Sequence, residues 1–375
     1  MKVINICGAR PNFMKIAPLM RAFATRPDIH PLLVHTGQHY DEAMSKAFFD
    51  DLHIPRPDIN LEVGSASHAV QTALIMERFE PIVLSEKPDA VLVVGDVNST
   101  IACGLVAVKL LVPLIHVEAG LRSFDRTMPE EINRVLTDVI SELLFVTESS
   151  GVRNLEHEGI PSSKIHLVGN VMIDTLLAHR QLADQSTVLD RLGLTPKRYG
   201  VLTLHRPANV DDPAVLAGIL DALEEIQRST PLVFPVHPRT RGNLEQTGLL
   251  ARLQRMPDMR LVEPLGYLDF LKLMSHAAVM LTDSGGIQEE TTVLGIPCLT
   301  LRQNTERPIT VEQGTNQVVG MSPSEILKAY RRIQDGQVSR RVPELWDGKA
   351  AERIADIMLR WNNMKVRDSR TEPGQ

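Results

Sequence analysis

Short apolar runs alternate with longer segments of helical periodicity along the first half of the chain. This alternation is typical of βαβ units, in which helices connect parallel strands and cover both faces of the sheet. The predicted strands are Val3–Cys7, Leu32–His35, Ala90–Val94, Leu114–Val117, Leu143–Val146 and Ile165–Val168. The predicted helices are Asn12–Thr25, Asp41–Phe49, His68–Ser85, Thr100–Leu110, Glu130–Ser141 and Gly151–Glu158. The first half therefore predicts an α/β domain with a doubly wound sheet.

The same alternation starts again in the second half, so we predict two doubly wound Rossmann-like domains, residues 1–169 and 170–348. The boundary is expected close to Gly169-Asn170. A last helix, Lys349–Trp361 within residues 349–363, is expected to pack back onto the first domain, and polar residues 364–375 to form a flexible tail. The second set of strands is Gly200–Leu204, Leu232–Val236, Met259–Val262, Ala278–Leu281 and Cys298–Leu301, with helices that include Pro213–Ile226 and Tyr267–His276.

Charge and cysteine content exclude several classes of protein. The 40 basic and 46 acidic residues give a net charge of −6 without a basic run, which argues against nucleic-acid and membrane-surface binding. The 3 cysteines are scattered without CxxC spacing, so neither a disulfide framework nor a structural zinc site is indicated. The first apolar run is too short for a signal peptide, and no run reaches the roughly 18 apolar residues of a membrane span. We expect a cytoplasmic protein.

Residues 281–290, LTDSGGIQEE, follow an apolar run and predict a strand, a turn and the start of a helix. Unpaired N–H groups at a helix N-terminus bind anions, and Gly285 and Gly286 allow a phosphate to approach the backbone. Ser284 adds a hydroxyl donor. A carboxylate one turn later, at Glu289 or Glu290, could accept hydrogen bonds from ribose hydroxyls. These residues together suit a nucleotide, although an ordinary corner with a capping serine is the alternative.

Ligands of open α/β sheets collect beyond the carboxyl ends of the strands, where this chain is polar. The first strand is followed by GARPNFMK, which brings Arg10 and Lys15 near a helix start. Two cations there would suit an anionic leaving group, although a lysine in this place is more often solvated. The chain contains neither GxGxxG nor GxxxxGK[ST]. Tightly held NAD and ATP chemistry are therefore disfavoured.

Acidic side chains follow two further strands. Asp96 ends one strand, and Glu118 ends the next in HVEAGLR. Glu130 follows in the first turn of a helix that starts MPEEINR. Each has an ordinary alternative: Asp96 could cap a helix, Glu118 could form a structural group with His116 and Arg122, and Glu130 suits the helix dipole. Three carboxylates at one edge of one sheet nevertheless indicate acid–base chemistry.

The second half has two strand exits that carry a histidine. His205 with Arg206 could bind phosphate or act as an acid or base near neutral pH, and His237 lies in PVHP after another strand. A lone histidine is usually satisfied by a neighbour, but two such exits indicate at least one functional contact. Arg307 in TERP could bind a carboxylate or phosphate bidentately.

Eight motifs of this chain, in their order, resemble those of the non-hydrolysing UDP-N-acetylglucosamine 2-epimerases. They are GARPxxxK, GDxxST, HVEAGLR, PEExNR, the His205-Arg206 exit, PVHP, TDSGGIQEE and TERP. The resemblance runs from about Met1 to the final helix. It implies a two-domain GT-B fold with the active site in the interdomain cleft, and a homodimer. It implies that the uridine nucleotide binds through Ser284, Gly285, Gly286, Glu290 and Arg307. It further implies that the reacting end is lined by Arg10, Lys15, Asp96, Glu118, Glu130, Arg134 and His205.

The chemistry explains why such residues are needed. The C2 hydrogen of an N-acetylglucosamine unit has no adjacent carbonyl, and oxidation at C3 would need a nicotinamide, for which the sequence offers no site. Elimination remains: a base removes the C2 proton while the C1–O bond breaks, giving UDP and 2-acetamidoglucal. UDP then adds back and C2 is reprotonated from the opposite face. Asp96, Glu118 and Glu130 are the candidate acid–base groups, and Arg10, Lys15 and His205 the partners of the leaving phosphate. No cofactor or metal is expected.

The chain departs from the better-known members at Gln38-His39-Tyr40-Asp41, at His205-Arg206-Pro207-Ala208 and in the short segment Phe124–Met128. These regions contribute to a second, regulatory substrate site in some bacterial members, so activation by substrate is left open. QHYD and MPEEINR also resemble the branch that acts on UDP-2,3-diacetamido-glucuronic acid. Three further functions stay open: a hydrolysing relative that releases N-acetylmannosamine, a GT-B glycosyltransferase and, less favoured, a nucleotide-sugar sensor.

Overall fold

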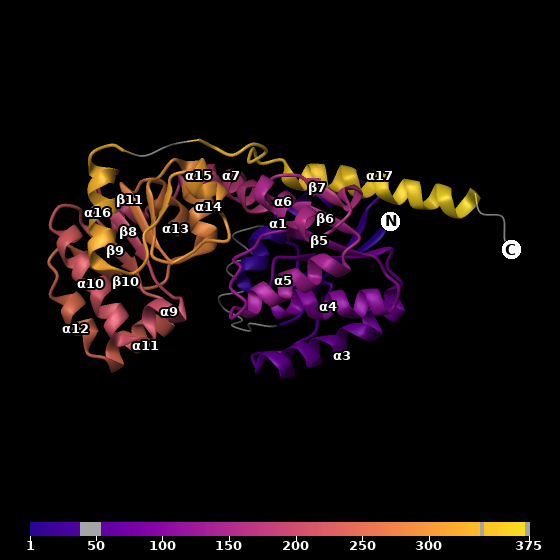
Figure 1. Cartoon of the computed structure of the whole chain (residues 1–375), viewed down its shortest axis with the longest axis horizontal. Helices are drawn as coiled ribbons and strands as arrows, with labels where there is room; N and C mark the ends of the chain where they lie inside the picture. The colour runs from indigo at the N-terminus through magenta and orange to yellow at the C-terminus, as the bar shows by residue number, and fades with distance from the viewer. Residues whose placement is uncertain (38–53, 338–340, 372–375) are drawn as a thin grey trace. The chain divides into compact units, whose positions relative to one another are not determined.

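The computed structural model describes residues 1–37, 54–337 and 341–371 (Figure 1). The chain divides into two compact units, Met1–Thr175 with Glu344–Gln375, and Leu176–Pro343. The helix expected over Asp41–Phe49 and the segment Gln38–Asp41 lie outside the described residues. No helix in the described ranges is both long and apolar enough to cross a membrane.

The first unit is built on a parallel sheet of 7 strands in the order β3-β2-β1-β4-β5-β6-β7. The chain moves outward from β1 in one direction and from β4 in the other, so their carboxyl ends form the switch point at which open sheets bind ligands. The strands are β1 Lys2–Cys7, β2 His30–His35, β3 Ile59–Asn60, β4 Ala90–Val94, β5 Leu114–Ala119, β6 Leu143–Val146 and β7 Ile165–Leu167.

Helices cover this sheet and bury its apolar strands. Figure 1 shows α3, α4 and α5 next to one another, and they pack consecutively. Ile4 and Val91 of the sheet lie in one core cluster with Phe79 of α3 and Cys103 of α4, all fully buried. Burying a side chain as large as Phe79 is worth about 1.5–3 kcal/mol. The helices are α1 Arg10–Ala24, α3 His68–Glu86, α4 Asn98–Lys109, α5 Pro129–Ile140 and α6 Ser149–His157.

The second unit repeats the plan with a sheet of 6 parallel strands in the order β10-β9-β8-β11-β12-β13. Its switch point lies at the carboxyl ends of β8 and β11. The strands are β8 Gly200–Thr203, β9 Leu232–Pro235, β10 Met259–Val262, β11 Val279–Thr282, β12 Cys298–Thr300 and β13 Asn316–Val318. Helix α7 Val171–Ala183 begins in the first unit and continues into the second. The other helices are α8 Val188–Arg191, α9 Pro207–Val210, α10 Pro213–Gln227, α11 Pro238–Gln246, α12 Leu249–Gln254, α13 Tyr267–Ser275, α14 Gly285–Leu294, α15 Ile309–Glu312 and α16 Pro323–Gln334.

The last helix, α17 Ala350–Thr371, packs against α1 of the first unit (Figure 1). The buried carboxylate of Asp174 accepts hydrogen bonds from the backbone N–H groups of Ala350 at 3.1 Å and Ala351 at 2.7 Å, which are donors that a helix N-terminus leaves unpaired. The helix extends beyond Trp361, the residue at which the sequence predicts its end. Residues 364–371 contain neither glycine nor proline, so nothing in them terminates a helix.

Candidate functional site

At the switch point of the first unit, Lys15 and Glu118 form a buried ion pair. Their side chains are only 6% and 4% exposed, so the alternative of a solvated Lys15 is wrong. Gly95, at φ +67°, leaves room for this pair, because a Cβ there would lie 2.8 Å from Lys15 Nζ. Removing one member of such a pair would leave an uncompensated buried charge, at a cost of about 3–5 kcal/mol.

The direction of the Glu118 side chain is set by an irregularity in β5. The pairing of β5 with β6 shifts register between Val117 and Ala119, and Glu118 has φ +74°. A bulge of this kind re-aims a side chain and is frequent next to active sites. Because a left-handed conformation is unfavourable for a residue with a Cβ, the surrounding structure must hold Glu118 in place.

Asp96 follows β4 and contacts Arg134 of α5 through an ion pair between Oδ2 and Nη2. Its side chain is 23% exposed, whereas Arg134 is buried. The second nitrogen of Arg134, Nη1, lies 2.5 Å from Oε2 of Glu131. The residue at the N-cap of α4 is Val97, without a side-chain capping bond, so the alternative of Asp96 as a cap is wrong.

Two other predicted residues lie at helix starts close by in the chain. Glu130 occupies the first turn of α5 and is half-buried, and Pro129 begins that helix. Arg10 is the first residue of α1, but its side chain lies outside the part of the chain that the structure describes.

His116 and Arg122 have structural partners. His116 Nδ1 lies 2.7 Å from Asp138 Oδ1, and His116 Nε2 lies 2.9 Å from the carbonyl oxygen of Gly95. Arg122 Nη1 lies 2.7 Å from the other oxygen of Asp138, and Nη2 lies 2.6 Å from Glu158 Oε2. Both side chains are buried. They fix the chain next to Asp96 and the segment that follows Glu118.

In the second unit, the predicted strand and helix are confirmed as β11 and α14, but the predicted turn Ser284-Gly285-Gly286 is shorter, because α14 already begins at Gly285. Ser284 occupies the N-cap but makes no side-chain capping bond, so the alternative of a capping serine is wrong. Gly286 is the second residue of α14. A Cβ at Gly285 would lie 2.8 Å from Arg307 Nη1, so this glycine is also required by the close approach of the arginine.

Arg307 is held by two carboxylates. Its Nε lies 2.8 Å from Oε1 of Glu289, and its Nη1 lies 2.7 Å from Oε1 of Glu306. Burial alone would raise the pKa of Glu306, but the charges of Arg307 and Arg302 outweigh it and hold that pKa well below its usual range. The guanidinium therefore lies beside the helix N-terminus in a fixed position.

Glu290 is buried near Tyr267 of α13, and their interaction favours the carboxylate form. Burial, followed by the charge of the neighbouring Glu289, raises the pKa of Glu290 to about 8. The carboxyl group therefore changes protonation state near neutral pH, a range in which an ordinary glutamate is fully ionised.

His205 and Asp283 connect the ends of β8 and β11 across the second switch point. His205 Nδ1 lies 2.8 Å from Asp283 Oδ1, and the backbone N–H groups of His205 and Arg206 donate to Asp283 Oδ2 at 2.9 and 2.8 Å. Burial raises the pKa of Asp283, but the His205 contact and these N–H donors bring it below the usual range. The His205 side chain is 41% exposed, and its ring centroid lies 6.0 Å from that of His237.

The chain is similar to known proteins along most of its length. It matches the model of the family described as UDP-N-acetylglucosamine 2-epimerase over residues 21–359. A Methanococcus maripaludis protein named UDP-N-acetylglucosamine 2-epimerase homolog is 47% identical over 360 residues, or 96% of this chain and 99% of the relative. The chain belongs to the UDP-N-acetylglucosamine 2-epimerase family. Members of this family are isomerases, so the predicted class of enzyme is confirmed and the glycosyltransferase alternative is set aside.

Two further comparisons bear on fold and substrate. The structure of the Methanocaldococcus jannaschii UDP-GlcNAc 2-epimerase in complex with UDP-GlcNAc and UDP has a TM-score of 0.89 and 42% identity, covering 96% of this chain and 99% of that one. The predicted α/β class and GT-B fold are thereby confirmed. A Pseudomonas aeruginosa relative named UDP-2,3-diacetamido-2,3-dideoxy-D-glucuronate 2-epimerase is 40% identical over 364 residues, or 96% of this chain and all of the relative.

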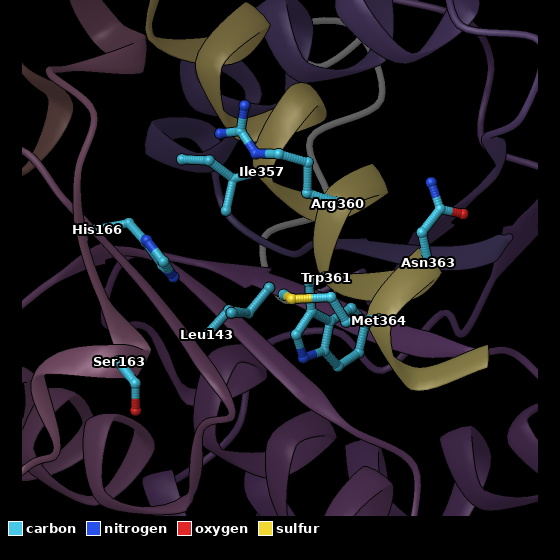
Figure 2. Close-up of a pocket in the computed structure, with 8 residues that line it drawn as sticks. All are labelled: Leu143, Ser163, His166, Ile357, Arg360, Trp361, Asn363 and Met364. Atoms are coloured by element: carbon cyan, nitrogen blue, oxygen red, sulfur yellow. The ribbon is translucent and has the colours of Figure 1, made fainter. Parts of the chain in front are cut away.

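A separate pocket of about 510 Å³ lies beside α17 in this family member (Figure 2). Figure 2 shows Trp361 and Met364 of α17 beside Leu143, with His166 further along the wall. Leu143 begins β6, and Ser163 lies two residues before the start of β7. The pocket therefore lies at the amino ends of strands, whereas the residues described above follow carboxyl ends. It contains none of the predicted site residues.

Three residues that matter to the site were not predicted. Asp283 holds His205, Glu131 holds Arg134, and Tyr267 influences the pKa of Glu290. Asp283 lies within LTDSGGIQEE and Glu131 within MPEEINR, so the available signal was an acidic residue inside each motif. Nothing in the sequence around Tyr267 connects it with Glu290. Among the described residues, no group of three or more His, Cys, Asp or Glu side chains could hold a metal ion.

Proposed function

We propose that the chain catalyses the non-hydrolysing C2 epimerisation of UDP-N-acetylglucosamine to UDP-N-acetylmannosamine. The observation that carries this proposal is the pair of carboxylates at neighbouring strand ends, Asp96 and Glu118, each in contact with its own cation. Inversion at C2 by elimination and re-addition needs an acid or base on each face of the sugar ring, and two separately held carboxylates can provide both.

In the proposed reaction, a base among Asp96, Glu118 and Glu130 takes the C2 proton while the electrons of the C2–H bond form the C1–C2 double bond. The C1–O bond breaks, and its electrons leave with UDP. UDP then adds back to C1 of 2-acetamidoglucal as an acid delivers a proton to the opposite face of C2. Lys15, Arg10 and the half-exposed His205 are proposed to stabilise the diphosphate.

We assign the nucleotide to the second unit. A surface suited to a diphosphate lies at the start of α14. It consists of the N–H groups of the first helical turn, the hydroxyl of Ser284, which makes no capping bond, and the adjacent guanidinium of Arg307. Gly285 and Gly286 belong to the first turn of this helix. Glu290 is proposed to accept from ribose hydroxyls, and His237 to contribute to substrate binding near His205.

Proton NMR with UDP-N-acetylglucosamine in D2O tests the reaction. Deuterium at C2 together with a UDP-N-acetylmannosamine signal is expected. Accumulation of UDP with free N-acetylmannosamine would instead indicate a hydrolysing enzyme. The Pseudomonas aeruginosa relative supports a second candidate substrate, UDP-2,3-diacetamido-2,3-dideoxy-D-glucuronate. Exchange with that sugar but not with UDP-N-acetylglucosamine would transfer the assignment to it.

A homodimer is also proposed, through α5. Ile132, Leu136 and Val139 are exposed at positions that share one face of this helix, whereas Glu131 and Arg134 are buried on another. A second copy would remove this apolar face from water. Light scattering is expected to give twice the chain mass, and Leu136→Arg to halve it, while Val311→Arg in α15 serves as an exposed apolar control. A wild-type monomer would rule the dimer out.

A further inference from the structure

Phe124, in the loop between β5 and α5, has two features that do not favour folding. Its side chain is 78% exposed, and its backbone has φ +57°. A bulky residue in the left-handed region costs about 1–2 kcal/mol, and an exposed ring gains little of the free energy that burial would provide. Strain of this kind is often found where a side chain must be presented to a ligand.

The conformation of Phe124 is imposed by Glu131. One oxygen of this buried carboxylate accepts hydrogen bonds from the N–H and the hydroxyl of Ser123, both at 2.9 Å, and the other accepts from the N–H of Phe124 at 3.0 Å. The next turn is fixed as well, because Asp125 Oδ1 accepts from the N–H and hydroxyl of Thr127 at 3.0 and 2.6 Å. The loop is therefore held at both sides of the ring.

The same carboxylate connects this loop to the reacting end of the site. Glu131 Oε2 lies 2.5 Å from Nη1 of Arg134, whose Nη2 contacts Asp96. Burial raises the pKa of Glu131, but the Ser123 and Phe124 bonds and the charge of Arg134 bring it below its usual range, so the carboxylate keeps its charge. One buried anion thus fixes both the exposed ring and the arginine that holds Asp96.

We propose that Phe124 binds the sugar of the substrate, packing against the apolar face of the pyranose and its acetamido methyl group, and that Glu131 is the positioning residue that presents it. This inference rests on the proposed function, because that function places the sugar at Asp96. An aromatic ring suits this contact because it offers a large, rigid area to a ligand that is apolar on one face and polar at its edges.

Another exposed apolar residue with positive φ has a different explanation. Leu111 is 90% exposed with φ +60°, but it follows the C-cap of α4, where a left-handed residue commonly ends a helix. Phe124 does not end a helix. Leu111→Ala is therefore a matched control, since it removes an exposed apolar side chain at positive φ that precedes β5, at the amino edge of the sheet.

The test compares KM for UDP-N-acetylglucosamine with inhibition by UDP, which lacks the sugar. Phe124→Ala is expected to raise KM by about tenfold, the effect of losing one aromatic contact, while the inhibition constant of UDP changes less than about twofold. Phe124→Gly is expected to raise KM equally while its Tm stays level or rises, because glycine relieves the strain at positive φ. Leu111→Ala should leave KM unchanged.

Glu131→Gln separates positioning from simple stability. It is expected to raise KM and lower kcat, and its effect on KM should be smaller in the Phe124→Ala background, because the two residues act through one ring. Unchanged KM in Phe124→Ala and Phe124→Gly, with C2 exchange intact in the wild type, would overturn the inference alone. If these variants change the molecular mass of the protein in solution, the sugar-binding role of Phe124 is wrong, and Phe124 instead contacts a second copy of the chain. Absence of C2 exchange in the wild type would instead remove the proposed function.

Discussion

Arg134 contacts Asp96 through Nη2 while its Nη1 contacts Glu131, so one guanidinium of α5 fixes the carboxylate that follows β4. The arginine is buried, whereas Asp96 keeps 23% of its side chain exposed. This arrangement gives Asp96 a fixed direction and an open side. Arg134, which the sequence predicts as a substrate-binding residue, thus contacts two carboxylates, as Arg307 does in the second unit.

Asp96→Asn is expected to lower turnover by about 10²–10⁴-fold, because an amide cannot exchange the C2 proton. UDP affinity should remain within a few fold, since Asp96 is not among the residues proposed to bind the nucleotide. Asparagine keeps an oxygen for Arg134, which limits the structural change. C2 deuterium exchange and calorimetric UDP titration measure the two effects. Wild-type turnover in this variant would show that Asp96 is not an acid or base.

Ser284→Ala is expected to weaken UDP binding by about fivefold, the value of one lost hydrogen bond, without lowering Tm. The reason is that Ser284 makes no capping bond in the folded protein. Arg307→Ala should weaken binding more but also destabilise the fold by about 3–5 kcal/mol, because Glu289 loses its cation and Glu306 loses one of its cations and keeps Arg302. Calorimetry and urea unfolding separate the two contributions. Unchanged UDP affinity in both variants would place the nucleotide elsewhere.

Glu290 should make stability depend on pH. Its pKa of about 8 in the folded protein lies above the ordinary value of 4.5, so the folded state binds the proton more tightly. The folded protein therefore loses stability as pH rises from the lower value to the upper one, and the loss levels off above it. Glu290→Gln removes this dependence. Its stability relative to wild type should increase with pH, by a few kcal/mol at most.

Urea unfolding of Glu290→Gln and wild type at pH 5, 7 and 9 measures this difference directly, and effects common to both proteins cancel. Tyr267→Phe provides a second variant, since it removes the hydroxyl whose interaction with Glu290 favours the carboxylate. The raised pKa should then rise further. A stability difference that is constant from pH 5 to 9 would contradict the shifted pKa.

The sequence predicted the longer strands and the fold class because buried parallel strands form recognisable apolar runs. It missed β3 and β13, which have 2 and 3 residues and lie at sheet edges, because such strands are too short to show a period. The burial of Lys15 was also beyond prediction. It depends on Glu118, which only the sheet topology and the bulge in β5 bring to it.

The same limit applies within the site. Acidic residues in the first turn of α5 were predicted, but the sequence could not show that Glu131 folds under the Ser123-Phe124 loop while Glu130 stays half-exposed. Gly285 was predicted from phosphate approach alone, whereas the structure adds the contact with Arg307. The residue types in the motifs thus indicated the chemistry of the site. Which residues contact one another was determined by packing between segments far apart in the sequence.

Gly169→Ala should be among the most destabilising glycine substitutions in the described residues. Gly169 has φ +88°, and an added Cβ would lie 2.0 Å from the backbone oxygen of Leu345, where the chain returns to the first unit. Gly159 has a similar φ of +81° with nothing within 4 Å of such a Cβ. Gly159→Ala therefore measures the conformational cost alone, about 1–2 kcal/mol.

The contact with Leu345 should add a further 1–3 kcal/mol or so to the cost of Gly169→Ala, because the obstacle is backbone and must move. Arg353 Nη1 donates to that same Leu345 oxygen at 3.3 Å and to the Val168 oxygen at 3.0 Å, so a shift also disturbs the anchoring of α17. Urea unfolding of the two variants gives the difference. Equal losses of stability would mean that the returning segment does not pack against Gly169.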